Sequence, residues 1–148
     1  MSLRYFEELE AGQKFASPTL TVDADAIVAF AREFDPQPFH LDDAAARASI
    51  FEGLAASGWH TAAMTMRLCV ASDFRPAGGI LGIGGELNWL KPVRPGDTLR
   101  VECEVLETRA SRSRPGQGIV KIRVATFNQH SETVQTFEPT LFVDRRPA

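Results

Sequence analysis

The chain has 148 residues, which is the size of one ordinary domain, and 44% of them are hydrophobic and 24% charged, as in soluble globular proteins. Its formal net charge of -3 argues against a nucleic-acid-binding protein, because such proteins present a basic face. No apolar run approaches the roughly 18–20 residues of a transmembrane helix, and the N-terminus lacks the apolar stretch of a secretion signal. We expect one domain over residues 1–148, without a membrane or nucleic acid as partner.

The first half of the chain predicts one broken strand and three helical segments. Residues 14–21 favour a strand that Pro18 interrupts, and Asp23 is a plausible N-cap for a helix that ends at Asp35, before two prolines. Residues 35–40 are expected to be rigid and extended, residues 42–49 a short helix, and residues 51–57 a loop. Residues 58–72 then predict a long helix so apolar on most sides that it should be buried.

The second half predicts antiparallel strands. Residues 80–90 favour a strand with glycine bends, and apolar residues alternate with polar ones over 98–108 and 119–128. Residues 133–143 are expected to form a final strand. Residues 91–97 have turn chemistry, and 109–118 are expected to form an exposed hairpin loop. The fold class is therefore α+β, with a sheet curling over a central helix, and the open edge of that sheet invites pairing with a second copy.

Two cysteines, Cys69 and Cys103, bear on location and metal binding. Neither stands in a CxxC or CxxH spacing, so no zinc site is expected. Two separate thiols in a chain with its own core are typical of the reducing cytosol, so the sequence predicts a cytoplasmic protein.

Asp35 and His40 are the first candidates for chemistry. They stand five residues apart on a segment stiffened by Pro36 and Pro38. A carboxylate and an imidazole held close together suit general acid–base catalysis, in which one group holds or deprotonates a water and the other delivers a proton. The alternative is that Asp35 only caps a turn and His40 is a satisfied structural histidine.

The start of the long helix is the second candidate. The first backbone N–H groups of a helix lack internal partners and lie at the positive end of its dipole, so the N–H of Gly58 is a natural site for a developing oxyanion. Alternatively, Ser57 is only an N-cap and Gly58 a packing glycine. His60 follows two residues later and is expected to be structural.

Three further side chains are candidates for substrate binding. Trp59 and Met66, with Met64, could line an acyl pocket, although such residues on a buried helix usually belong to the core. Arg94, in the turn before a strand, could grip phosphate groups. Arg109, Arg112 and Arg114 are expected to be solvated in the hairpin loop.

Residues 34–42 (FDPQPFHLD) resemble the signature Gly-Asp-x-Asn-Pro-x-His-x-Asp of the MaoC-like dehydratases, which include (R)-specific enoyl-CoA hydratases. Residues 56–61 (ASGWHT) and 91–97 (KPVRPGD) resemble the family's second and third blocks, in the same order. The chain departs from the family at Phe34, Gln37 and Met66, where the family has Gly, Asn and, in known hydratases, Ser. These departures affect the shape and polarity of the pocket, and so the substrate.

The resemblance implies a hot-dog fold, usually dimeric, in which an antiparallel sheet wraps around a long helix. It implies a lyase of fatty acid metabolism that hydrates an enoyl-CoA or dehydrates a 3-hydroxyacyl-CoA, with Asp35 and His40 handling the water and the α-carbon proton. It also implies that the Gly58 N–H polarises the thioester carbonyl. No metal or cofactor is expected apart from the CoA of the substrate, and the partner is a second copy or a higher homo-oligomer. The side chains expected to bind substrate are Gln37, Phe39, Ser57, Trp59, Met66 and Arg94.

Two other functions stay open at this point. Hot-dog proteins also hydrolyse thioesters, and the chain could bind acyl-CoA without catalysis. Asp35 and His40 together count against a pure binder.

Overall fold

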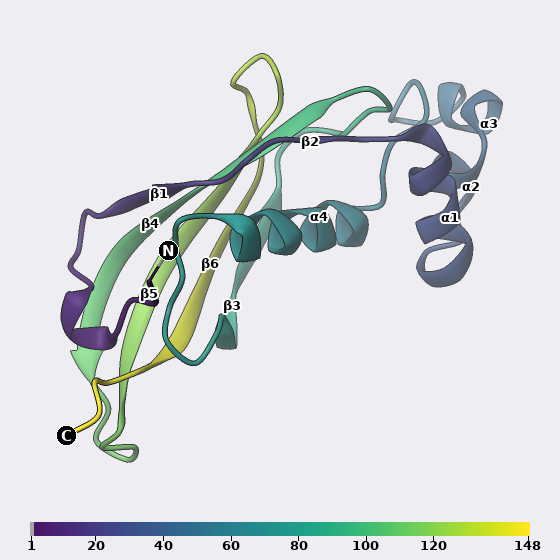
Figure 1. The fold of residues 1–148 in the computed structure, drawn as a ribbon. Helices are drawn as coiled ribbons and strands as arrows, with labels where there is room; N and C mark the ends of the chain where they lie inside the picture. The colour runs from purple at the N-terminus through teal and green to yellow at the C-terminus, as the bar shows by residue number, and fades with distance from the viewer. Residues whose placement is uncertain (1) are drawn as a thin grey trace.

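A six-stranded antiparallel sheet curves around one long helix, α4 (Gly58–Ala71), in the computed structural model, which describes residues 2–148 (Figure 1). Five strands follow one another in the order β1-β4-β5-β6-β3, and β2 pairs separately with β4. The strands are β1 (Lys14–Ala16), β2 (Leu20–Thr21), β3 (Leu81–Trp89), β4 (Thr98–Ala110), β5 (Gln117–Phe127) and β6 (Thr133–Asp144).

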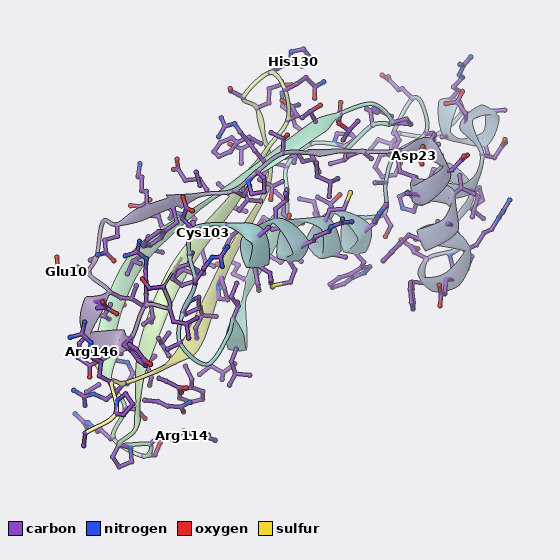
Figure 2. All side chains as sticks on the ribbon, viewed as in Figure 1. Glu10, Asp23, Cys103, Arg114, His130 and Arg146 are labelled. Atoms are coloured by element: carbon purple, nitrogen blue, oxygen red, sulfur yellow. The ribbon has the colours of Figure 1, made fainter. Side chains whose placement is uncertain are left out.

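The three long strands supply one wall of the core. Alternate residues of β4 and β5 are buried, as the period-two pattern predicted, and they include Val101, Cys103, Val105, Ile122 and Val124. Cys103, labelled in Figure 2, has its Sγ 3.8 Å from that of Cys69 on α4, and both thiols are free. The sheet and α4 therefore share one core.

Helix α4 is buried on one side only, so the expectation of burial on most sides was wrong for the isolated chain. Its N-cap is Ser57, whose Oγ accepts from the Trp59 N–H at 3.2 Å. Met64, Thr65 and Leu68 face the sheet and are buried, whereas Val70 is 62% exposed. The helix presents its other face to solvent because no second layer of the same chain covers it.

Three short helices gather at the end of the molecule where α4 starts (Figure 1). They are α1 (Ala24–Phe34), α2 (Pro38–Leu41) and α3 (Asp43–Arg47), and a 3-10 turn, η1 (Phe6–Glu8), precedes β1. Asp23 caps α1 as predicted. The extended segment expected over 35–40 was wrong in its second half, because Pro38 occupies the first position of α2, where its missing N–H costs nothing.

The hairpin between β4 and β5 is shorter than the expected 109–118, because Arg109 lies within β4.

The overall arrangement, an antiparallel sheet around a central helix, is the hot-dog fold that the sequence led us to expect. No helix within residues 2–148 has the length and apolar character to cross a membrane.

Candidate active site

Asp35, His40 and Ser57 meet where α1 ends and α4 begins. Asp35 is the C-cap of α1, and its Oδ2 lies 3.4 Å from Nε2 of His40 in α2. The same oxygen accepts a 2.6 Å hydrogen bond from Ser57 Oγ. The Asp35 side chain is only 15% exposed. The Asp35 carboxylate therefore contacts other side chains and makes no hydrogen bond that caps a turn, in contrast to the structural alternative.

The orientation of the His40 ring is fixed by the loop before α4. Its Nδ1 lies 2.7 Å from the carbonyl oxygen of Ala55. A carbonyl only accepts, so Nδ1 carries the proton and Nε2 is the atom presented to Asp35. The ring is buried, with Phe39 against its edge and Phe51 tilted beside it. The Ala55 carbonyl could not be predicted from the sequence, because every residue carries a backbone carbonyl.

Asp35 is held in its charged form. Burial raises the pKa of the Asp35 carboxyl, but the hydrogen bonds from Ser57 and Gln37 and the charge of His40 outweigh it, so that the pKa lies below its usual range. The Gln37 Nε2 donates to Asp35 Oδ1 at 2.6 Å. Gln37, predicted as a substrate-binding residue, is therefore also a positioning residue for the carboxylate.

Replacing Ser57 with Ala is expected to raise the pH at which Asp35 takes up a proton. The hydrogen bond that the Ser57 hydroxyl donates stabilises the charged form of Asp35 more than its protonated form. Without this hydrogen bond, the pKa of Asp35 rises. The ¹³C resonance of the Asp35 carboxyl carbon, followed through an acid titration, measures the change. Ser57→Thr, which keeps a hydroxyl, is the control, and a titration identical in the wild type and Ser57→Ala contradicts the assignment. Loss of the cap should also cost about 1 kcal/mol of stability.

A cavity of about 230 Å³ opens beside this group of residues, and His40 and Gly58 both line it. The remaining walls come from the loop before α4, from α4 itself and from the end of β3 and the turn after it, namely Phe51, Ala56, Thr61, Trp89, Leu90, Lys91, Pro92 and Val93. The N–H of Gly58 is the first of α4 and makes no hydrogen bond with the rest of the described chain. His40 and the glycine that carries the available helix-start N–H therefore line one cavity, and Asp35 and Ser57 are not among its lining residues.

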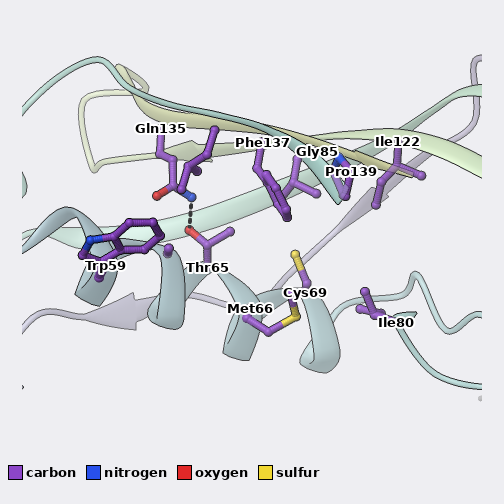
Figure 3. Close-up of a pocket in the computed structure, with 13 residues that line it drawn as sticks. Trp59, Thr65, Met66, Cys69, Ile80, Gly85, Ile122, Gln135, Phe137 and Pro139 are labelled. Atoms are coloured by element: carbon purple, nitrogen blue, oxygen red, sulfur yellow. Dashed lines mark hydrogen bonds between the residues drawn. The ribbon is translucent and has the colours of Figure 1, made fainter. Parts of the chain in front are cut away.

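Trp59 and Met66 lie at a second, apolar cavity of about 350 Å³, between α4 and the sheet (Figure 3). Both side chains are partly exposed, at 59% and 38%. Phe39 packs against His40 and is not among the residues that line either cavity. Their predicted roles in substrate binding stay predictions.

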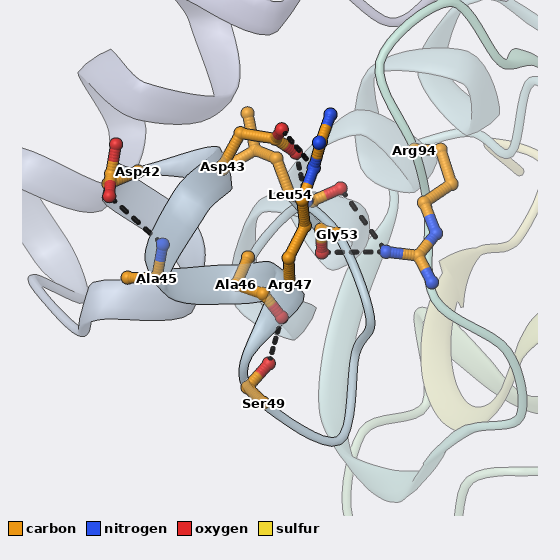
Figure 4. A network of polar contacts seen from close by, with 9 residues as sticks. All are labelled: Asp42, Asp43, Ala45, Ala46, Arg47, Ser49, Gly53, Leu54 and Arg94. Atoms are coloured by element: carbon orange, nitrogen blue, oxygen red, sulfur yellow. Dashed lines mark hydrogen bonds and ion pairs between the residues drawn. The ribbon is translucent and has the colours of Figure 1, made fainter.

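Arg94 has contacts that favour a different role from the predicted grip on phosphate. Its guanidinium donates to the backbone carbonyls of Gly53, at 2.7 Å, and Leu54 (Figure 4). It also donates to the backbone carbonyl of Phe51. The side chain of Asp43 accepts from the Leu54 N–H at 3.0 Å and ties the same loop to α3. Arg94 thus supports the loop that carries the Ala55 carbonyl.

Replacing Arg94 with Met is expected to lower the free energy of unfolding by about 1–3 kcal/mol, because hydrogen bonds from a charged donor to partly buried carbonyls are lost. Thermal and denaturant unfolding measure it, with Arg112→Met in the exposed hairpin as control. A higher KM for CoA esters with unchanged stability would instead support the original phosphate role.

His60 stays outside this group of residues, as expected. Its ring stacks on Phe30 with centroids 4.7 Å apart, and burial lowers its pKa.

Among residues 2–148 no cluster of three or more His, Cys, Asp or Glu side chains is arranged to hold a metal ion. Trp89 is among the wall residues that the sequence did not single out, and its position depends on the pairing of β3 with β6.

Two curated proteins are similar to this chain in sequence. YdeM of Bacillus subtilis (strain 168), an uncharacterised protein, is 36% identical over 140 residues, which are 93% of this chain and 95% of YdeM. Mesaconyl-CoA hydratase of Cereibacter sphaeroides is 39% identical over 61 residues, 41% of this chain and 18% of that longer protein.

Two solved structures superpose on most of the chain. A MaoC-like dehydratase from Rhodospirillum rubrum has a TM-score of 0.95 and 54% identity, covering 98% of this chain and 99% of that one. The (R)-hydratase PhaJ1 of Pseudomonas aeruginosa has a TM-score of 0.76 and 29% identity, covering 96% and 86%. The family model described as "MaoC like domain" matches residues 7–127, and the chain therefore belongs to the MaoC-like dehydratase family.

Proposed function

We propose that this protein adds water reversibly to a 2-enoyl thioester of the CoA type. The observation that carries the proposal is the approach of an Asp35 carboxylate to the His40 imidazole, 3.4 Å away, beside a cavity that the free Gly58 amide also lines. Membership of a dehydratase family, and similarity to an (R)-hydratase and a mesaconyl-CoA hydratase, support the same reaction class.

In the proposed reaction, the thioester oxygen accepts a hydrogen bond from the Gly58 N–H, which draws electrons from the double bond and makes the β carbon electrophilic. A water held by the Asp35 carboxylate gives one proton to Nε2 of His40 while its oxygen bonds to the β carbon. The π electrons move to the thioester oxygen as an enolate. The carbonyl then re-forms and the α carbon takes the proton from Nε2, so that one water is added in all.

The test uses the purified protein with trans-2-enoyl-CoAs of several chain lengths. Hydration is followed by loss of enone absorbance, and the 3-hydroxyacyl product is identified by mass spectrometry in ¹⁸O-labelled water. One labelled oxygen in the product supports the proposal. Release of free CoA thiol without a hydroxylated product would favour a thioesterase, and binding without turnover of any ester would favour an acyl-CoA-binding protein.

We also propose that a second copy covers the exposed edge of the sheet. Strand β3 has no neighbour beyond it in the chain, and its Leu81 and Ile83 are about half exposed, as is Trp59 on the adjoining face of α4. Light scattering should give about twice the chain mass of 16.2 kDa. Ile83→Lys should lower it, because a charge would then be buried at the edge. A single-chain mass for the wild type at micromolar concentration contradicts the proposal.

A further inference from the structure

The two cavities follow one another along a single face of α4. We call the cavity of about 230 Å³ that His40 and Gly58 line the catalytic cavity, and the one of about 350 Å³ the apolar cavity. Gly58 and Thr61 line the first, and Ala62, Thr65 and Cys69 line the second. Residues three and four apart share a helix face, so an acyl group bound at Gly58 has the second, larger cavity ahead of it. What lies between the two cavities therefore limits the length of the acyl chain.

Trp89 connects the walls of the two cavities. Its side chain lines the catalytic cavity, and its Nε1 donates at 3.0 Å to Oε1 of Gln135, which lines the apolar cavity. The indole also lies directly against Gly58, since a Cβ added there would be 2.7 Å from Trp89 Cδ2. An acyl chain whose carbonyl meets the Gly58 N–H therefore has the indole ring in its way.

The indole is held in place by the sheet and by a buried polar network. Trp89 and Gln135 are paired residues of β3 and β6, so their side chains share one face of the sheet. Gln135 is 1% exposed and donates to Thr65 Oγ1 at 3.0 Å, a hydrogen bond visible in Figure 3, and Thr65 in turn contacts Thr126 Oγ1 at 2.7 Å. Moving the indole would take the donor away from the buried Oε1 of Gln135, which is costly.

We propose that Trp89, anchored by Gln135, is the residue that restricts this enzyme to short acyl chains by closing the catalytic cavity off from the apolar cavity. The inference rests on the proposed hydratase function and adds its substrate class, short-chain 2-enoyl thioesters. Opening the partition would join about 350 Å³ of apolar space to the site.

The test compares kcat/KM for crotonyl-CoA and trans-2-dodecenoyl-CoA in the wild type and Trp89→Ala. One methylene in an apolar pocket changes kcat/KM by roughly tenfold or more, so the dodecenoyl-to-crotonyl ratio should rise at least about tenfold in Trp89→Ala. Trp89→Phe should move the ratio the same way by less, and serves if the Ala variant does not fold. Leu87→Ala, which enlarges the apolar cavity without opening the partition, is the matched control and should leave the ratio unchanged.

An unchanged ratio in both Trp89 variants, or an equal rise in Leu87→Ala, would overturn the inference while leaving the hydratase function intact. A wild type without turnover overturns the proposed function instead. In that case calorimetric binding of butanoyl-CoA and dodecanoyl-CoA to the same variants still tests the partition, because binding needs no chemistry. A higher affinity of Trp89→Ala for dodecanoyl-CoA supports it, and equal affinities in the wild type and the variant reject it.

Discussion

Asp35→Asn is expected to lower kcat for enoyl-CoA hydration by about 10²–10⁴-fold, the usual contribution of one acid–base group. The amide keeps the shape of the carboxylate but has no charge to hold the water or to stabilise the His40 imidazolium. The lowered pKa of Asp35 means that the group lost is a carboxylate at neutral pH. The rate is measured from the decay of enone absorbance at saturating substrate.

Two controls separate chemistry from structure in this variant. Asp25→Asn changes an exposed carboxyl in the first turn of α1 and should leave kcat unchanged. Binding of butanoyl-CoA to Asp35→Asn should stay within a few-fold of the wild type, because the thioester contacts lie elsewhere. Equal turnover by the wild type and Asp35→Asn would remove Asp35 from the mechanism.

The fold was predictable because its elements carry strong periodic signals. The alternation over β4 and β5 and the apolar run of α4 gave these elements and the α+β class directly. The short turn α2 was missed because a proline is compatible both with an extended segment and with the first position of a helix. Four residues of helix are too few to show a period.

The site was only partly predictable. Asp35 and His40 stand close in sequence on a proline-stiffened segment, so their proximity follows from local chain geometry. The contacts of Ser57 with Asp35 and of Trp89 with Gln135 join residues 22 and 46 positions apart. The second contact depends on the register of β3 against β6, and a shift of one residue would turn Trp89 to the other face. The alternation indicates which face a strand buries, but it does not indicate which residues of the distant strand β6 pair with β3.

Arg94 illustrates the same limit for charged residues. Its position before a strand was compatible with phosphate binding, but three backbone carbonyls accept from its guanidinium. Carbonyl acceptors belong to the conformation of the loop and have no residue type of their own. A sequence can therefore indicate that an arginine is available without indicating which acceptor it finds.

His40→Asn should lower kcat by about 10²–10⁴-fold as well, because it removes the Nε2 atom that faces Asp35. The Asn amide can still donate to the Ala55 carbonyl, so the local fold should survive. Circular dichroism and thermal unfolding check the fold, and enone absorbance gives the rate. Thr133→Asn, a polar change in β6 outside both cavities, is the control.

The combination of Asp35→Asn with His40→Asn tests whether the two residues act as one unit. If His40 takes the proton only from a water that Asp35 holds, then removing either group disables the same step. The double variant should fall no more than about tenfold below the slower single variant, whereas independent groups would multiply their losses. Multiplied losses would mean that the carboxylate and the imidazole act on separate steps. The proposed route of the proton, from the water to Nε2 of His40 and then to the α carbon, would in that case be wrong.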